Sequence, residues 1–211
     1  MRAVLAGFEN QIFDAQRAFR AVLTALSEPG RPVRLPVELP PLGLAPSAAG
    51  AMLALADIDT PVWLSPSLND LRTYLRFHTG AGAADDCGGA VFGLAADISE
   101  LPPLVHFSAG TAISPETSAT LIVGVADFTS GVEATFTGPG LREPVSIAPA
   151  GFDVARWSEL IANHDAFPKG VDLLLCCGEA IVGVPRSTRI TIASTGAVVT
   201  AATTATVEAG N

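Results

Sequence analysis

The stretch from residue 167 to residue 188, FPKGVDLLLCCGEAIVGVPRST, constrains the fold of this chain more than any other. Residues 171–177 form an apolar run rich in β-favouring residues, Gly178-Glu179 interrupts it, and residues 180–184 resume it before Pro185. A turn dipeptide between two such runs is typical of a β-hairpin, and proline ends the pairing of a strand. The stretch therefore predicts a buried hairpin in which Gly178 adopts a backbone conformation that is costly for residues with a Cβ atom.

The chain has 211 residues, enough to bury a full hydrophobic core within one domain. We expect that domain to span residues 1–193, followed by a low-complexity tail at 194–211 that is rich in Thr, Ala, Gly and Val. Hydrophobic residues make up 49% of the chain and charged residues 16%, so we expect other subunits to cover part of the surface. Because soluble oligomers most often close as twofold dimers, a homodimer is the expected assembly.

The formal net charge of −9 argues against nucleic acid as a partner, because binding to a phosphate backbone rests largely on Lys and Arg. Lys169 is the one lysine, so an anion site must be built from arginine side chains or backbone amides. No apolar run reaches the roughly 18 residues of a membrane span. Glu9 and Asp14 interrupt the place where the apolar part of a signal peptide would lie. We therefore expect a cytoplasmic protein without a membrane partner.

The three cysteines, Cys87, Cys176 and Cys177, are too few and too oddly placed for a secreted disulfide scaffold. Cys176 and Cys177 are neighbours on a predicted strand, so their side chains point to opposite faces and cannot easily share a zinc ion. The sequence also lacks the histidine spacings that bring several metal ligands onto one element. These observations predict structural thiols and no metal site.

Helical and strand patterns alternate irregularly along the chain. Apolar residues at three- and four-residue steps predict helices at 8–27, 47–58 and 153–163, with Ser47 as the N-cap of the second. A short helix at 68–75 and a poor helix at 99–107, weakened by Pro102-Pro103, complete the helical set. Besides the hairpin, β-rich runs predict strands at 31–35, 62–64, 76–78, 90–95, 121–125, 132–137, 145–147 and 188–192. The pattern predicts an α/β or α+β class with a mixed sheet flanked by helices.

Individual side chains give weaker indications of a site. His78 ends the predicted strand 76–78 where a Gly-rich loop begins, a place where sheets of this class bind ligands, although a histidine satisfied by a carbonyl is the commoner case. Glu116 and Glu179 are isolated loop carboxylates, for which exposure to solvent is the default. Arg186, just beyond the hairpin, is placed to clamp an anion or carboxylate, and a surface salt bridge is at least as good an interpretation. In either case we expect Arg186→Ala to leave the fold nearly intact.

The ordered segments of the chain resemble the PhnH family, the H subunit of the bacterial carbon–phosphorus lyase system for phosphonate use. The resemblance covers residues 13 to 188, and Ser118 departs from it at a position where glycine is expected. The matching pieces are Phe13-Asp14, Phe19-Arg20, Ser27-Glu28-Pro29-Gly30, Leu55-Ala56-Asp57, Asp59-Thr60-Pro61-Val62-Trp63-Leu64, Leu75-Arg76-Phe77-His78-Thr79, Gly110-Thr111-Ala112, Pro115-Glu116, Ala119-Thr120-Leu121-Ile122, Thr137-Gly138-Pro139-Gly140, Phe167-Pro168, Gly170-Val171-Asp172-Leu173, Cys177-Gly178-Glu179 and Pro185-Arg186-Ser187-Thr188.

The resemblance implies an α/β fold, a three-layer sandwich similar to the large domain of pyridoxal-phosphate-dependent transferases but without that cofactor. The residues agree on the last point, because a pyridoxal enzyme needs a Schiff-base lysine and the one lysine, Lys169, lies between Pro168 and Gly170 in a turn. We therefore expect no cofactor.

The resemblance further implies assembly with the G, I and J subunits into a core complex. That complex attaches an alkylphosphonate to the ribose of ATP, releases adenine, and later cleaves the carbon–phosphorus bond. Radical chemistry of this kind needs cysteine-held iron–sulfur ligands, which this sequence does not offer. The favoured function is an accessory, non-catalytic subunit that supports the ribose-attachment step. The alternative is a free-standing nucleotide- or phosphonate-binding protein or transferase, with ATP or a phosphonate bound near the candidate contact residues His78, Thr79, Thr111, Glu116, Glu179 and Arg186.

Overall fold

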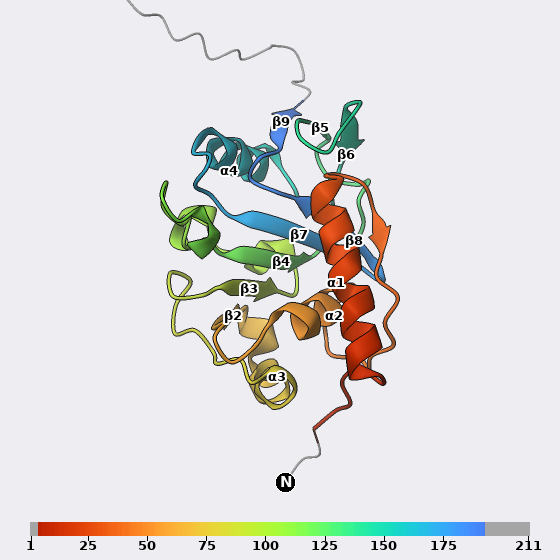
Figure 1. The fold of residues 1–211 in the computed structure, drawn as a ribbon. Coiled ribbons are helices and arrows are strands. Elements are labelled where there is room, and N and C mark those ends of the chain that lie inside the picture. Colours follow the sequence, from red (N-terminus) through yellow and green to blue (C-terminus); the bar gives the residue numbers. More distant parts are fainter. Residues whose placement is uncertain (1–3, 193–211) are drawn as a thin grey trace, which may run out of the picture.

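A computed structural model describes residues 4–192, and the predicted tail at 194–211 lies outside these residues. The centre of the fold is a mixed six-stranded sheet (Figure 1). Four of its strands run parallel and lie side by side in chain order, the next pairs antiparallel with them as the second arm of the hairpin, and the last is a short edge strand. In spatial order the strands are β1 (Val33–Arg34), β8 (Ala180–Val184), β7 (Asp172–Cys177), β4 (Thr120–Gly124), β3 (Phe92–Ala95) and β2 (Val62–Leu64).

Side chains alternate across the two faces of this sheet and fill two separate cores. Ile122 of β4 and Leu174 of β7 face one core, whereas Leu121 and Leu173, their neighbours in the chain, face the other, and all four are fully buried. The first core is covered by α1 (Gln11–Ser27) and α2 (Pro46–Leu55), with α3 (Arg72–Thr79) at its margin; Figure 1 shows α1 crossing in front of the sheet. Strands buried on both faces explain the continuous apolar runs in the sequence.

The second core lies beneath α4 (Val154–Asp165) and a small antiparallel sheet (Figure 1). The strands of that sheet, in spatial order, are β6 (Val145–Ile147), β5 (Ala134–Thr137) and β9 (Arg189–Ile192). Trp157 of α4 is fully buried here, and its indole N–H donates to the carbonyl of Val132 at 2.8 Å. The α/β class and the mixed sheet flanked by helices are confirmed, and the outer layer contains a second sheet that the sequence interpretation did not separate from the first.

Three predictions of local structure are wrong: the strand at 76–78, the N-cap at Ser47 and the helix at 99–107. Residues 76–78 are not a strand but the last turns of α3, which follows the 3-10 turn η1 (Pro66–Leu71). Tyr74 and Leu75 are its buried residues, and Gly80 ends the helix with φ +79°. Ser47 is not an N-cap, because α2 begins one residue earlier and the buried Ser47 hydroxyl donates to the carbonyl of Ala180 at 3.0 Å. The segment 99–107, predicted as a poor helix, holds only the 3-10 turns η2 (Ile98–Glu100) and η3 (Leu104–His106).

The predicted hairpin is present with Cys177 paired to Ala180, so Gly178 and Glu179 form a two-residue turn. Gly178 has φ +53°, in the left-handed region that residues with a Cβ atom avoid. No helix within residues 4–192 is both long and apolar enough to cross a bilayer.

Gly178→Val is therefore expected to lower the free energy of unfolding by about 1–3 kcal/mol, because a β-branched residue is strained at this φ. A Cβ atom at this position would meet nothing within 4 Å, so strain of the backbone is the whole effect. Gly178→Asn is the matched control, since asparagine tolerates the left-handed region, and it should cost less than half as much in urea denaturation. Equal costs for the two variants would contradict this explanation.

Candidate functional site

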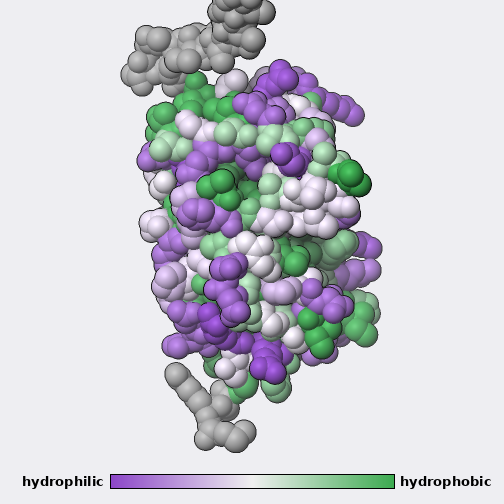
Figure 2. All heavy atoms as spheres, turned by 90° about the vertical axis from the view of Figure 1, so that its left-hand side faces the viewer, coloured by the Kyte–Doolittle hydropathy of each residue, from purple (hydrophilic) through white to green (hydrophobic). Residues whose placement is uncertain are grey.

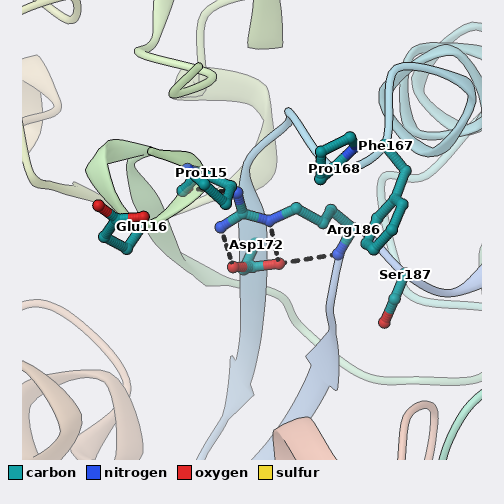
Figure 3. A pocket seen from close by; sticks show the side chains of 7 residues that line it. All are labelled: Pro115, Glu116, Phe167, Pro168, Asp172, Arg186 and Ser187. Atoms are coloured by element: carbon teal, nitrogen blue, oxygen red, sulfur yellow. Dashed lines mark hydrogen bonds and ion pairs between the residues drawn. The ribbon is translucent and has the colours of Figure 1, made fainter. Parts of the chain in front are cut away.

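A cavity of about 350 Å³, open to solvent, lies where the parallel strands β4 and β7 begin (Figure 3). Three segments from distant parts of the sequence meet there: the turn before β4, the loop between α4 and β7 with the first residue of β7, and the exit of β8. The lining residues are Pro115, Glu116, Phe167, Pro168, Asp172, Arg186 and Ser187. Open α/β sheets usually bind ligands at the opposite edge, beyond the carboxyl ends of the strands. This cavity is thus not in the usual ligand position of such a sheet.

The cavity is organised around an ion pair between Arg186 and Asp172, whose side chains are only 13% and 21% exposed. The guanidinium engages both carboxylate oxygens, with Nε donating to Oδ1 at 3.1 Å and Nη2 donating to Oδ2 at 2.5 Å, as Figure 3 shows. The backbone N–H of Arg186 also donates to Oδ1, at 2.8 Å. Such a two-point, charge-assisted contact is stronger than a single hydrogen bond between neutral groups.

The same guanidinium fastens the turn that precedes β4. Nη1 donates to the carbonyl of Pro115 at 2.9 Å, and Nη2 donates to the hydroxyl of Ser118. The carbonyl of Arg186 in turn lies 3.0 Å from Nδ1 of His164 in α4. Four of the five guanidinium N–H groups of Arg186 therefore have acceptors inside the chain, and the ion pair that Arg186 makes is largely buried.

Of the other predicted contacts, only Glu116 lines this cavity. Its side chain is exposed, and none of the hydrogen bonds and ion pairs found within residues 4–192 involves its carboxylate. Thr111 belongs to the same loop but builds the turn itself: its hydroxyl accepts from the N–H of Ser114 at 2.9 Å, and its own N–H donates to the carbonyl of Ser114 at 3.2 Å. The structure thus brings Glu116 and Arg186 together, with Thr111 close by in sequence.

His78 and Thr79 lie elsewhere, at the end of α3. The imidazole Nε2 of His78 is 2.9 Å from the carbonyl of Leu5, and its ring packs against Tyr74 with 4.5 Å between the ring centroids. The Thr79 hydroxyl donates to the carbonyl of Leu75 at 2.7 Å and accepts from the N–H of Ala81 at 3.0 Å. Both side chains are used to hold the N-terminal segment and the end of the helix.

Glu179 lies at the opposite edge of the sheet, in the hairpin turn. Its carboxylate pairs with Nε of Arg34 at 2.8 Å, and both side chains are about half exposed or more. They line a second depression of about 260 Å³, together with Asp14 and Arg17 of α1. The hydrogen bond from Arg17 holds the pKa of Asp14 below its usual value. Both guanidinium groups of this depression are used in ion pairs, and the carboxylates of Glu9 and Glu38 line it in addition.

Asp172, the partner of Arg186, is the important residue that the sequence reasoning did not select. The hairpin register could have found it, because counting back from the pair Cys177 and Ala180 places residue 172 opposite residue 185. A carboxylate at 172 and an arginine at 186 then fall within reach of each other. No strand register could have placed Phe167, Pro168 and Pro115 at this cavity, because these three residues lie in loops.

Of the three cysteines predicted to be structural thiols, Cys176 and Cys177 lie in β7, and Cys176 is fully buried. Cys87, Cys176 and Cys177 are all unpaired, and burial raises the pKa of the Cys176 thiol to about 12, so it stays protonated at neutral pH. The thiol of Cys177 donates to the carbonyl of Ala126. Within residues 4–192, no group of three or more His, Cys, Asp and Glu side chains is arranged to hold a metal ion.

Comparison with known proteins relates the chain to phosphonate metabolism. The family model described as "Bacterial phosphonate metabolism protein (PhnH)" matches residues 6–191. The chain is 34% identical to the alpha-D-ribose 1-methylphosphonate 5-triphosphate synthase subunit PhnH of Rhizobium meliloti (strain 1021), over 87% of this chain and 93% of that protein. It is 30% identical to the putative C-P lyase subunit protein HtxG of Stutzerimonas stutzeri, over 84% of this chain and 86% of that protein. The chain belongs to the PhnH family of bacterial phosphonate metabolism proteins.

Proposed function

We propose that this protein is an accessory, non-catalytic subunit of a carbon–phosphorus lyase complex, and that it supports the step in which an alkylphosphonate is joined to the ribose of ATP with release of adenine. Both relatives are named as subunits, one of a synthase of a ribose methylphosphonate triphosphate and one of a putative C-P lyase. Since the matches cover most of each chain, the proposal concerns the whole protein rather than a shared fragment.

The accessory role is supported by the hydrogen bonds that the guanidinium of Arg186 already makes inside the chain. An enzyme that binds the triphosphate of ATP needs donors that are free to meet phosphate oxygens. The one guanidinium that lines the cavity donates instead to Asp172, Pro115 and Ser118. A site whose cation already uses four of its five N–H groups inside the chain supports a structural role better than catalysis on a phosphorylated substrate.

The G, I and J subunits are the proposed partners, in the cytoplasm, with the protein itself as a homodimer. Exposed apolar side chains support association: Ile12, Phe19 and Leu23 on the outer side of α1 are 51–79% exposed. No pyridoxal cofactor enters the proposal, because Lys169 lies exposed in the turn before β7, outside the residues that line the cavity.

The test is a gene deletion complemented by the tagged chain, with growth on methylphosphonate as the readout, followed by affinity purification. We expect growth to be restored and the G, I and J subunits to co-purify. The isolated chain is then titrated with ATP and with methylphosphonate by calorimetry, where we expect no tight binding. Tight binding of either ligand by the isolated chain would instead favour the alternative of a free-standing binding protein or transferase.

A further inference from the structure

The cavity at the amino edge of the parallel strands has the chemistry of a protein-docking pocket. Pro115, Phe167 and Pro168 supply apolar walls, and Figure 3 shows Arg186 extended between Phe167 and Pro168 on one side and Glu116 on the other. Its charged side chains are Glu116, Asp172 and Arg186, so one negative charge remains after the ion pair is counted. Aromatic and proline walls around a single uncompensated charge favour an apolar group that carries a cation beside it.

The surroundings add to the negative potential at this cavity. Helix α4 ends at Asp165, two residues before Phe167, and the carboxyl end of a helix carries a partial negative charge. Lys169 follows in the chain but is not among the lining residues. The whole chain has a formal net charge of −9. A phosphate or phosphonate group placed here would meet a partial negative charge and Glu116, with no free guanidinium to offset them.

Exposed apolar side chains continue beyond the cavity. Phe167 is 59% exposed, and Ile113, two residues before the lining Pro115, is 95% exposed. Figure 2 looks onto this side of the molecule, where hydrophobic patches lie among hydrophilic ones. A large aromatic ring beside a pocket is typical of the few residues that contribute most of the affinity at a protein interface.

We propose that this cavity is the docking site for a segment of a partner subunit that inserts an apolar side chain between Phe167 and Pro115 and places a neighbouring Lys or Arg against Glu116. The inference rests on the proposed function, which supplies the partner. In this proposal the cavity is an interface with a partner subunit and not a ligand site. The ion pair of Arg186 and Asp172 is an internal brace that holds the three segments of the cavity together.

Two exposed side chains can be changed without touching that brace. Phe167→Ala removes the aromatic wall, and Glu116→Lys reverses the free charge. The matched controls are Phe77→Ala, a phenylalanine on α3 that is 68% exposed, and Glu143→Lys, an exposed glutamate beyond β5. The measurement is the Kd of each purified variant for the immobilised complex of the G, I and J subunits, at low and at high salt.

Phe167→Ala is expected to weaken this Kd at least about tenfold, the effect of losing an interface anchor. Glu116→Lys should weaken it about five- to tenfold at low salt and less at high salt, because screening reduces the contribution of a rim charge. Both controls should stay within about twofold of wild type. Circular dichroism and thermal unfolding of each variant verify that the fold is retained.

The outcomes separate this inference from the proposed function. If wild type does not bind the complex, the proposed function fails and the docking site with it. If wild type binds and both cavity variants bind equally well, the docking site alone is refuted. The inference is also overturned if the cavity variants abolish binding of ATP or methylphosphonate to the isolated chain, or if sedimentation shows that they dissociate a homodimer while leaving the Kd for the complex unchanged.

Discussion

Replacing Asp172 by alanine should lower the free energy of unfolding by about 3 kcal/mol, because removing one partner of a largely buried ion pair leaves the other charge without compensation. Arg186 would remain only 13% exposed, with its Nε and its backbone N–H both deprived of their acceptor. Each unsatisfied buried donor adds to the cost. Urea denaturation monitored by tryptophan fluorescence measures the change.

Arg186→Met tests the same brace from its other side and should cost a similar amount, since it leaves Asp172 unpaired and releases the turn at Pro115. The double variant should cost clearly less than the sum of the two, as expected for residues in direct contact. The control is the exposed pair of Arg34 and Glu179, where Glu179→Ala should change stability by no more than about 0.5 kcal/mol. Additive costs for Asp172 and Arg186, or a cost below about 1 kcal/mol, would contradict the bracing role.

These expected costs differ from the sequence-based expectation that Arg186→Ala leaves the fold nearly intact. The sequence places Arg186 directly after Pro185, beyond the second strand of the hairpin, where a charge normally meets solvent. What the sequence does not display is the approach of the turn at Pro115 and Ser118, which comes from a crossover about 70 residues earlier. Loops that meet at one edge of a sheet have no periodicity or register that links them in sequence.

The elements that could be predicted are those with a strong local pattern. The hairpin, β2, β4 and α4 follow from apolar runs, turn dipeptides and helical spacing, and Gly178 has the positive φ that its place in the turn requires. The helix that contains residues 76–78 could also have been predicted from the sequence. The spacing i, i+3, i+4, i+7 of a helix is present at Leu71, Tyr74, Leu75 and His78. The sequence interpretation instead ended a short helix at residue 75 and assigned residues 76–78 to a strand.

The family resemblance does not single out the cavity, because its segments contain all six contacts chosen in the sequence analysis as well as the residues that line the cavity. Each lining residue lies in a segment on which the resemblance rests, from Pro115-Glu116 through Phe167-Pro168 and Asp172 to Arg186-Ser187. Three of the six contacts chosen individually, His78, Thr79 and Glu179, lie at other parts of the fold. Motifs that lie far apart in the sequence can be assigned to one site only when the fold shows that the crossovers bring them together.

Gly183→Ala should destabilise the protein by about 3 kcal/mol, the upper part of the range for overpacking, although it adds a single methyl group. Gly183 lies in β8 beneath α1, and a Cβ atom there would come within 2.3 Å of the carbonyl oxygen of Ala25 and 2.8 Å of the backbone nitrogen of Leu26. Those are backbone atoms, so the contact can be relieved only by moving the helix. Ala18 and Ala25, both fully buried, show that α1 lies close to the sheet along this side.

The matched control is Gly82→Ala, where φ is not positive and a Cβ atom would meet nothing within 4 Å. That variant should be neutral or stabilising by up to about 1 kcal/mol, because alanine reduces the conformational freedom of the unfolded chain. Urea denaturation gives both values, and near-ultraviolet circular dichroism reports whether the tertiary packing of Gly183→Ala is altered. A Gly183→Ala variant as stable as Gly82→Ala would mean that α1 can move away from β8 without loss. The first core would then depend on the other contacts of α1 rather than on its close approach to the sheet.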